Sequence, residues 1–157
     1  RAWVLVLSAV LACATCTAAA DAGSDASAPP ASASPPHKFY VEDIKLAMTT
    51  HIAENLDANG TFHLRDDRTG ELLALKFVKI HDPVRRIDDG TYFACTDFQV
   101  AGEPDKLYDL DFWMKPQSSK LKIYDTRVHK EPRWSLIYGW YKQPRYTFVD
   151  DRVVSLY

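Results

Sequence analysis

The sequence predicts an α+β protein in which one N-terminal helix packs on a four- to five-stranded antiparallel sheet. Two observations support this class. Apolar residues recur at steps of three and four between Val41 and Leu56, and after Gly60 the apolar period changes to two. Short turns separate the later segments, which favours antiparallel neighbours. Because a single helix can cover one face of such a sheet, we expect a two-layer sandwich.

The helix is predicted over residues 41–56, and its apolar stripe contains Ile44, Met48 and Ile52. Two carboxylates in its first turn, Glu42 and Asp43, suit the positive end of the helix dipole. Residues 59–60, an Asn-Gly pair, are expected to end the helix, because both residue types tolerate the left-handed cap.

Strands are predicted wherever alternating apolar residues lie between turn residues. In residues 71–81 the alternation changes phase after Phe77, which indicates a bulge or a strand buried on both faces. The predicted strands cover residues 61–65, 71–81, 91–100, 106–115 and 120–130.

The chain has 157 residues and a formal net charge of −2, from 19 Lys and Arg and 21 Asp and Glu. This near-neutral balance argues against a nucleic-acid-binding protein that relies on a basic surface. The motifs HExxH, GxSxG, GxGxxG and the P-loop do not occur in the sequence. We therefore predict no cofactor, no metal site and no specific catalytic residue.

Residues 1–20 have the features of a signal peptide, since residues 2–12 form an apolar run too short to span a bilayer. Residues 10–13 match a lipobox, which would make Cys13 the lipidated residue. Cleavage after Ala20, at an A-x-A site, is the alternative. Residues 21–37 form an Ala/Ser/Pro linker that is expected to be disordered. The single folded domain should therefore cover residues 38–157 of an exported protein, periplasmic or anchored to a bacterial outer membrane.

The order of elements over residues 41–130 resembles the cystatin-like group of folds, in which a curved sheet wraps one N-terminal helix. The inhibitory Q-x-V-x-G loop of cystatins does not occur here. The segments YFACTDF and YDLDF are similar to strands of uncharacterised bacterial exported, lipoprotein-like proteins. That resemblance implies no known activity.

Alternation along the predicted strands places several polar side chains on the sheet face that points away from the helix. These residues form a candidate binding surface: Asp97, Asp109, Asp111, Asp125, Arg127 and His129, with His81 nearby. The same pattern suits a solvated face with ordinary ion pairs. It also suits an acid/base centre built from an Asp with His129 or His81. Cys95 is predicted to be a small buried core residue.

Aromatic residues are concentrated in residues 134–157. One interpretation is an extra hairpin that completes the sheet. The other is an exposed aromatic surface for binding, formed by Trp134, Tyr138, Trp140 and Tyr141.

Together these features predict a non-enzymatic exported binding domain that is tethered to the cell envelope. Its partner would be an unknown protein or envelope component and not nucleic acid, with membrane attachment if Cys13 is acylated. A small hydrolase or isomerase that uses an Asp/His pair in a sheet cavity is one alternative. A structural envelope protein is another.

Overall fold

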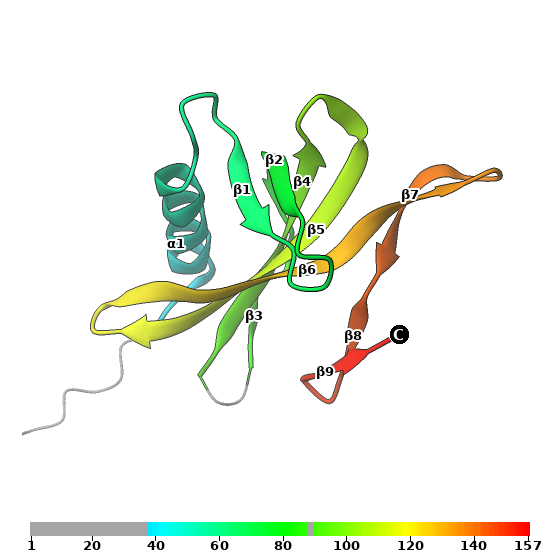
Figure 1. Ribbon diagram of the computed structural model, residues 1–157. Helices are drawn as coiled ribbons and strands as arrows, with labels where there is room; N and C mark the ends of the chain where they lie inside the picture. The colour runs from blue at the N-terminus through cyan, green and yellow to red at the C-terminus, as the bar shows by residue number, and fades with distance from the viewer. Residues whose placement is uncertain (1–37, 88–89) are drawn as a thin grey trace, which may run out of the picture. The chain divides into compact units, whose positions relative to one another are not determined.

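A computed structural model describes residues 38–87 and 90–157 of the chain. The predicted signal peptide, the lipobox with Cys13 and the linker all lie outside the described residues. Within them the chain forms one helix and nine strands (Figure 1). These elements are α1 Val41–Glu54, β1 Phe62–Arg65, β2 Leu72–Ile80, β3 Arg85–Arg86, β4 Tyr92–Val100, β5 Glu103–Gln117, β6 Lys120–Ser135, β7 Gly139–Pro144, β8 Tyr146–Val149 and β9 Arg152–Ser155.

The protein is mostly β, and the prediction of a helix on a four- to five-stranded sheet is wrong. The main sheet has seven antiparallel strands, in the order β1-β2-β4-β5-β6-β7 with β3 also paired to β4. Strands β8 and β9 form a separate two-stranded sheet. The cystatin-like two-layer sandwich that the sequence predicted is therefore corrected to a larger, predominantly β architecture.

The predicted strands 106–115 and 120–130 stop shortly before Pro116 and Pro132, whereas β5 and β6 continue through these prolines. Pro116 and Pro132 resemble strand breakers, yet each lies inside a strand. The pairing of β5 with β4 stops at Met114, and the pairing of β6 with β5 stops at Lys130. At each proline the strand is therefore paired on one side only. On the unpaired side, the missing N–H group removes no hydrogen bond between strands.

The helix also ends earlier than predicted, at Glu54 with Asn55 as its C-cap. The prediction that the Asn-Gly pair ends the helix is wrong. Gly60 instead has a positive φ of 68° inside a turn organised by Asp57. The Asp57 carboxylate accepts hydrogen bonds from the backbone N–H groups of Asn59 and Thr61. A polar side chain that bonds local backbone groups favours such a turn over continued helix.

One face of the sheet packs on α1 and contains the hydrophobic core. Ile44, Met48 and Ile52 from the helix are all buried, as their spacing predicts. Their partners on the sheet include Leu75, Phe98, Leu110, Phe112 and Met114. The phase change predicted in β2 corresponds to an irregularity in the ladder between Phe77 and Lys79.

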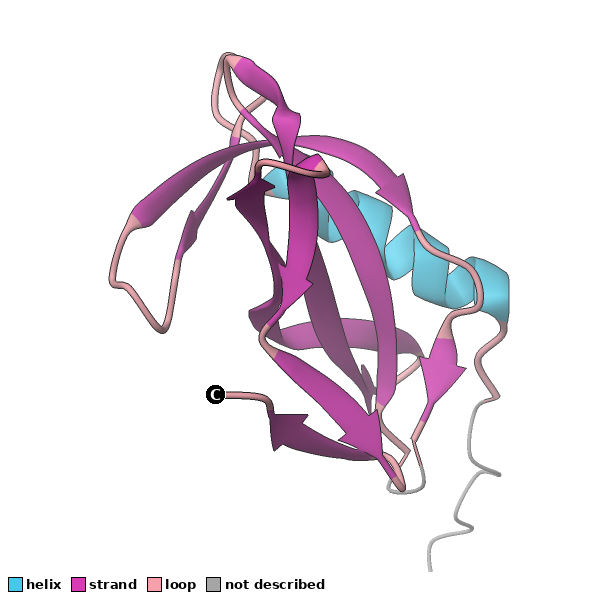
Figure 2. Cartoon of the chain, turned by 90° about the vertical axis from the view of Figure 1, so that its right-hand side faces the viewer, coloured by secondary structure: helices cyan, strands magenta, loops and turns pink. Residues whose placement is uncertain are grey.

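The C-terminal segment packs on the opposite face of the same strands. The Phe148 ring from β8 lies 4.9 Å from Phe93 on β4 and 6.0 Å from Trp113 on β5, between ring centroids. Figure 2 shows the strands of the main sheet in front of the helix, with the short C-terminal hairpin on the near side. The central strands are thus covered on both faces.

Strand β6 links the two ends of the molecule. Residues 120–130 pair with β5 on the side of α1, and the last five residues of the strand pair only with β7. Figure 1 shows this β6–β7 hairpin extending away from the rest of the sheet. We call residues 132–144 the arm.

Candidate functional site

Strands β4 and β5 bring buried polar side chains together on the face opposite the helix. Cys95 pairs with Asp111, and Asp97 pairs with Asp109, two positions apart in the β4–β5 ladder and therefore on the same face. Asp109 and Asp111 are fully buried, with 0% of their surface exposed. Like charges directly opposite each other on a sheet are destabilising. Buried carboxylates in this arrangement therefore need compensating groups.

Two lysines and a histidine compensate Asp97 and Asp109. Lys130 Nζ lies 2.8 Å from Asp109 Oδ2, and Lys142 Nζ donates a hydrogen bond to Asp97 Oδ1. His81 bridges the pair, with Nε2 2.9 Å from Asp97 Oδ2 and Nδ1 3.6 Å from Asp109 Oδ1. The exposed Lys79 adds a longer contact, with its Nζ 3.9 Å from Asp97 Oδ2, so cationic groups surround both carboxylates.

The environment of this cluster favours the charged forms of Asp97 and Lys130. Burial alone would raise the pKa of Asp97, but the contacts from Lys142 and His81 prevail, and that pKa lies below its ordinary value. Burial alone would lower the pKa of Lys130, but its contact with Asp109 prevails and raises that pKa. Opposite charges at close range account for both directions.

A second cluster surrounds Asp111. The Cys95 thiol donates to Asp111 Oδ1 at 2.6 Å, and the Tyr146 hydroxyl donates to Asp111 Oδ2 at 2.6 Å. His129 Nδ1 lies 3.5 Å from Asp111 Oδ1 and 3.7 Å from Cys95 Sγ. Burial, together with the charge of Asp111, raises the pKa of the Cys95 thiol and that of Tyr146. Both groups therefore keep their protons and act as donors.

A bulge in β6 brings His129 into this cluster. Asp109 pairs with Lys130 and Leu110 pairs with Val128, so His129 is the extra residue between them. Bulges redirect side chains in this way. The Tyr146 ring then stacks on the imidazole of His129, with centroids 4.8 Å apart and planes at 20°.

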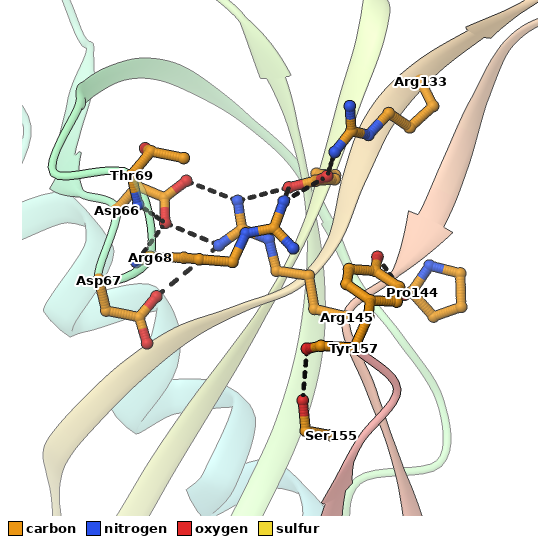
Figure 3. A network of polar contacts seen from close by, with 10 residues as sticks. Asp66, Asp67, Arg68, Thr69, Arg133, Pro144, Arg145, Ser155 and Tyr157 are labelled. Carbon is orange, nitrogen blue, oxygen red and sulfur yellow. Dashed lines mark hydrogen bonds and ion pairs between the residues drawn. The ribbon is translucent and has the colours of Figure 1, made fainter.

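A third cluster fixes the C-terminal segment to the rest of the protein (Figure 3). Arg145 donates through both terminal nitrogens to Asp66, in the β1–β2 turn, and through Nε to Glu131 Oε2 at 2.7 Å. Arg68 and Arg133 also contact Glu131. The bonds from Arg145 lower the pKa of Asp66. Burial would raise the pKa of Glu131, but Arg145 and Arg133 lower it.

The structure brings together five of the seven polar residues that the sequence selected. Asp97, Asp109, Asp111, His81 and His129 lie in the two clusters of the sheet face. Asp125 and Arg127 lie farther along that face and pair with each other at 2.6 Å in a partly exposed position.

Several members of these clusters were not selected from the sequence. Cys95 was predicted to be a core residue, but it lies half-buried among polar groups. Cys95 and Asp97 are two positions apart on β4 and so share a face of the sheet. This spacing could have identified Cys95 as a member of the polar surface. Lys130 could not be found by alternation, because the bulge at His129 reverses the pattern. Lys142, Arg145 and Tyr146 come from a segment that folds back over the sheet, and no local pattern predicts such a return.

The arm carries the aromatic residues that the sequence singled out. At its tip Leu136 is 95% exposed, Ile137 is 81% exposed and Tyr138 is 77% exposed. Trp134 and Trp140 meet edge to face behind the tip, with ring centroids 5.7 Å apart. Trp134, Trp140 and Tyr141 are also exposed. The arm thus presents several exposed apolar and aromatic side chains at its tip and along its strands.

Comparison with known proteins found no match: no protein family, curated protein or solved structure resembles the chain detectably. Within residues 38–87 and 90–157, no helix is both long and apolar enough to cross a membrane. The fold and site together define a mostly β domain with a charged, covered sheet face and a projecting aromatic arm.

Proposed function

We propose that the protein is a non-enzymatic exported binding domain that contacts a lipid surface through its arm. The observation that carries this proposal is the exposure of Leu136 and Ile137 at the tip. Two adjacent large aliphatic side chains at this degree of exposure are costly in water. Each would contribute about 1.5–3 kcal/mol if it were fully buried in an apolar phase.

The order of residue types along the arm favours a bilayer interface as the partner. The aliphatic tip is flanked by Trp134 on β6 and by Tyr138, Trp140 and Tyr141 on the β7 side, whose rings combine an apolar body with a polar group. Such residues are enriched at the headgroup level of membranes. Residues 132–144 contain no Asp or Glu, so no acidic side chain of the arm opposes contact with an anionic surface.

A contact of this size gives weak, reversible binding, and stable attachment to a membrane commonly needs a second anchor. The predicted lipidation of Cys13 would supply one, and the predicted linker would let the domain reach the surface. Mass spectrometry of the mature N-terminus tests this part of the proposal. A diacylglyceryl group on Cys13 supports it, whereas a mature chain that starts at Asp21 contradicts it.

The enzyme alternative is less well supported by the geometry. An Asp/His centre must reach a substrate, but Asp109 and Asp111 are fully buried and Tyr146 stacks over His129. A groove between α1 and β6, lined by residues that include Leu46 and His51, contains none of these groups. A structural envelope protein would give no reason for an exposed aliphatic tip.

Vesicle co-sedimentation tests the arm directly. The full-length chain is mixed with vesicles of phosphatidylethanolamine and phosphatidylglycerol. The double variant Leu136→Asp/Ile137→Asp should bind at least tenfold more weakly than the natural sequence. Leu72→Asp, at another exposed strand leucine, is the matched control and should bind normally. Because all three proteins share residues 1–37, the comparison cancels any contribution from that segment. Equal binding by the double variant and the natural sequence would contradict the proposal.

Tryptophan fluorescence gives a second readout on the same vesicles. The sequence has four tryptophans, and two of them, Trp134 and Trp140, lie in the arm. In a Trp3→Phe background, insertion of the arm should shift the emission to shorter wavelength. If emission shifts only with vesicles that carry a protein or glycan, the arm binds that component and not lipid.

A further inference from the structure

We propose that Cys95, Asp111 and His129 form a binding site for a divalent first-row transition-metal ion, with Zn²⁺ as the best match to the three donors. The proposal does not depend on the function of the arm, which is on a different part of the sheet. It rests on the geometry of the three donor atoms and on the charge around Asp111.

Two of the three separations between the donor atoms match those that a small metal ion requires, and the third must lengthen. Four ligands around Zn²⁺ at 2.0–2.3 Å are separated from one another by about 3.3–3.8 Å. His129 Nδ1 lies 3.5 Å from Asp111 Oδ1 and 3.7 Å from Cys95 Sγ. The distance from Cys95 Sγ to Asp111 Oδ1 is 2.6 Å, which is a hydrogen bond. It must open by about 1 Å when a metal ion replaces the shared proton.

Asp111 differs from the other buried acidic residues in its charge partners. Among the described residues, Asp66, Asp97, Asp109 and Glu131 each contact a Lys or an Arg. Asp111 is fully buried, and its ion pairs among the same residues involve only His129. A buried carboxylate without a fixed cation is costly, and metal coordination is one way in which proteins compensate it.

Metal binding at this site gives a neutral set of ligands and metal, and it releases one proton. The ion takes a carboxylate oxygen of Asp111, the unprotonated Nδ1 of His129 and the sulfur of Cys95. The Cys95 thiol releases its proton to solvent, so one dication is neutralised by one thiolate and one carboxylate. The fourth position remains for water or for another small ligand, as in zinc sites with three protein ligands.

The mixture of ligand atoms determines the class of ion. A thiolate and an imidazole favour Zn²⁺, Co²⁺, Ni²⁺ or copper over Mg²⁺ and Ca²⁺, which prefer oxygen ligands. The neighbouring group of His81, Asp97 and Asp109 is a poorer site. Its carboxylates already contact Lys130 and Lys142, and these ammonium groups would repel a dication.

Co²⁺ titration of the full-length chain tests the site, because cobalt bound to thiolate gives a charge-transfer band. The chain has three cysteines, so the titration uses a Cys13→Ser/Cys16→Ser background in which Cys95 is the last one. We expect a charge-transfer band that saturates at one Co²⁺ per chain and disappears when Zn²⁺ is added. Without such a band the proposal fails, whatever any variant does.

Variants then identify the other two ligands. Asp111→Asn keeps the shape of the side chain but removes its charge, and it should weaken Co²⁺ binding at least tenfold. His129→Ala should do the same. His81→Ala is the matched control in the neighbouring cluster and should leave the affinity unchanged. A tenfold loss with His81→Ala, or full affinity in Asp111→Asn, would overturn the assignment. Vesicle binding by the arm should be unaffected in all three variants, so failure here is separable from failure of the proposed function.

Discussion

The two faces of strands β4 and β5 are buried by different means. On the helix side, Met48 and its neighbours pack against Phe98, Leu110 and Phe112, and burial removes apolar surface from water. On the other side, the C-terminal segment covers Asp97, Asp109 and Asp111. There the stability depends on each charge having a partner. On the helix side, the stability lost on substitution should increase with the side-chain volume removed. On the C-terminal side, it should depend on which charged contact is lost.

The largest effect should come from breaking the charge network on the C-terminal side. Arg145→Met keeps much of the side-chain volume but leaves Asp66 and Glu131 without their main cation. Removing one partner of a buried ion pair costs about 3–5 kcal/mol. Urea denaturation should show this loss in the free energy of unfolding.

Arg133→Met is the control for that variant. Arg133 also pairs with Glu131, but its side chain is about half exposed. Exposed ion pairs contribute about 0–1 kcal/mol, so the free energy of unfolding should change by no more than that. If both variants lose the same amount of stability, the distinction between the two arginines is wrong.

On the helix side, Met48→Ala should cost about 2–5 kcal/mol, in the range found for buried large-to-small substitutions. Met48 is fully buried in the core. Leu46→Ala, on the exposed side of the same helix, should change the free energy of unfolding by less than about 0.5 kcal/mol. A small effect of Met48→Ala would mean that the core can close around the missing side chain.

A decrease in pH should destabilise the charge network but not the apolar core, with a smaller effect on stability than the substitutions above. The pKa values of Asp66 and Glu131 are lower in the folded protein than their ordinary values. The stability that these two carboxylates contribute is present above the ordinary carboxyl pKa of about 4, and it is lost as the pH falls toward the folded values.

Arg145→Met provides the comparison for this pH dependence. Without the guanidinium, the folded pKa values of Asp66 and Glu131 should be less depressed, because Arg133 still contacts Glu131 and the Arg68 backbone N–H still contacts Asp66. Urea denaturation from pH 7 to pH 3 should therefore show a steeper loss of stability in the natural sequence than in Arg145→Met. Met48→Ala should keep the steep loss, because it leaves the carboxylates intact. Parallel curves for all three proteins would contradict the assigned role of Arg145.

Much of the sheet could be predicted from the sequence because its strands alternate regularly. Alternation correctly separated Leu110 and Phe112 from Asp109 and Asp111, and it located the irregularity in β2. Alternation failed to predict the structure at two places. Pro116 and Pro132 interrupted the pattern at positions where the ladder is one-sided. The bulge at His129 reversed it and left Lys130 out of the predicted surface.

The partners of the buried charges depend on long-range contacts that no local pattern contains. Asp66 begins the β1–β2 turn. Its bond to Arg145 joins residues 79 positions apart. Such pairs are determined by how the C-terminal segment returns to the sheet, which composition and spacing do not specify.

The position of Arg145 in the chain has a consequence for synthesis. Ribosomes make the chain from the N-terminus, so Asp66 and Glu131 both emerge before the guanidinium that neutralises them. Until then, the face of the sheet that β8 later covers remains open to water, where its carboxylates are solvated. A nascent chain can therefore assemble the helix-covered core first, while the final charged contacts close only after residue 145 has been added. A chain interrupted between Glu131 and Arg145 would lack β8 and would leave that face of the sheet uncovered.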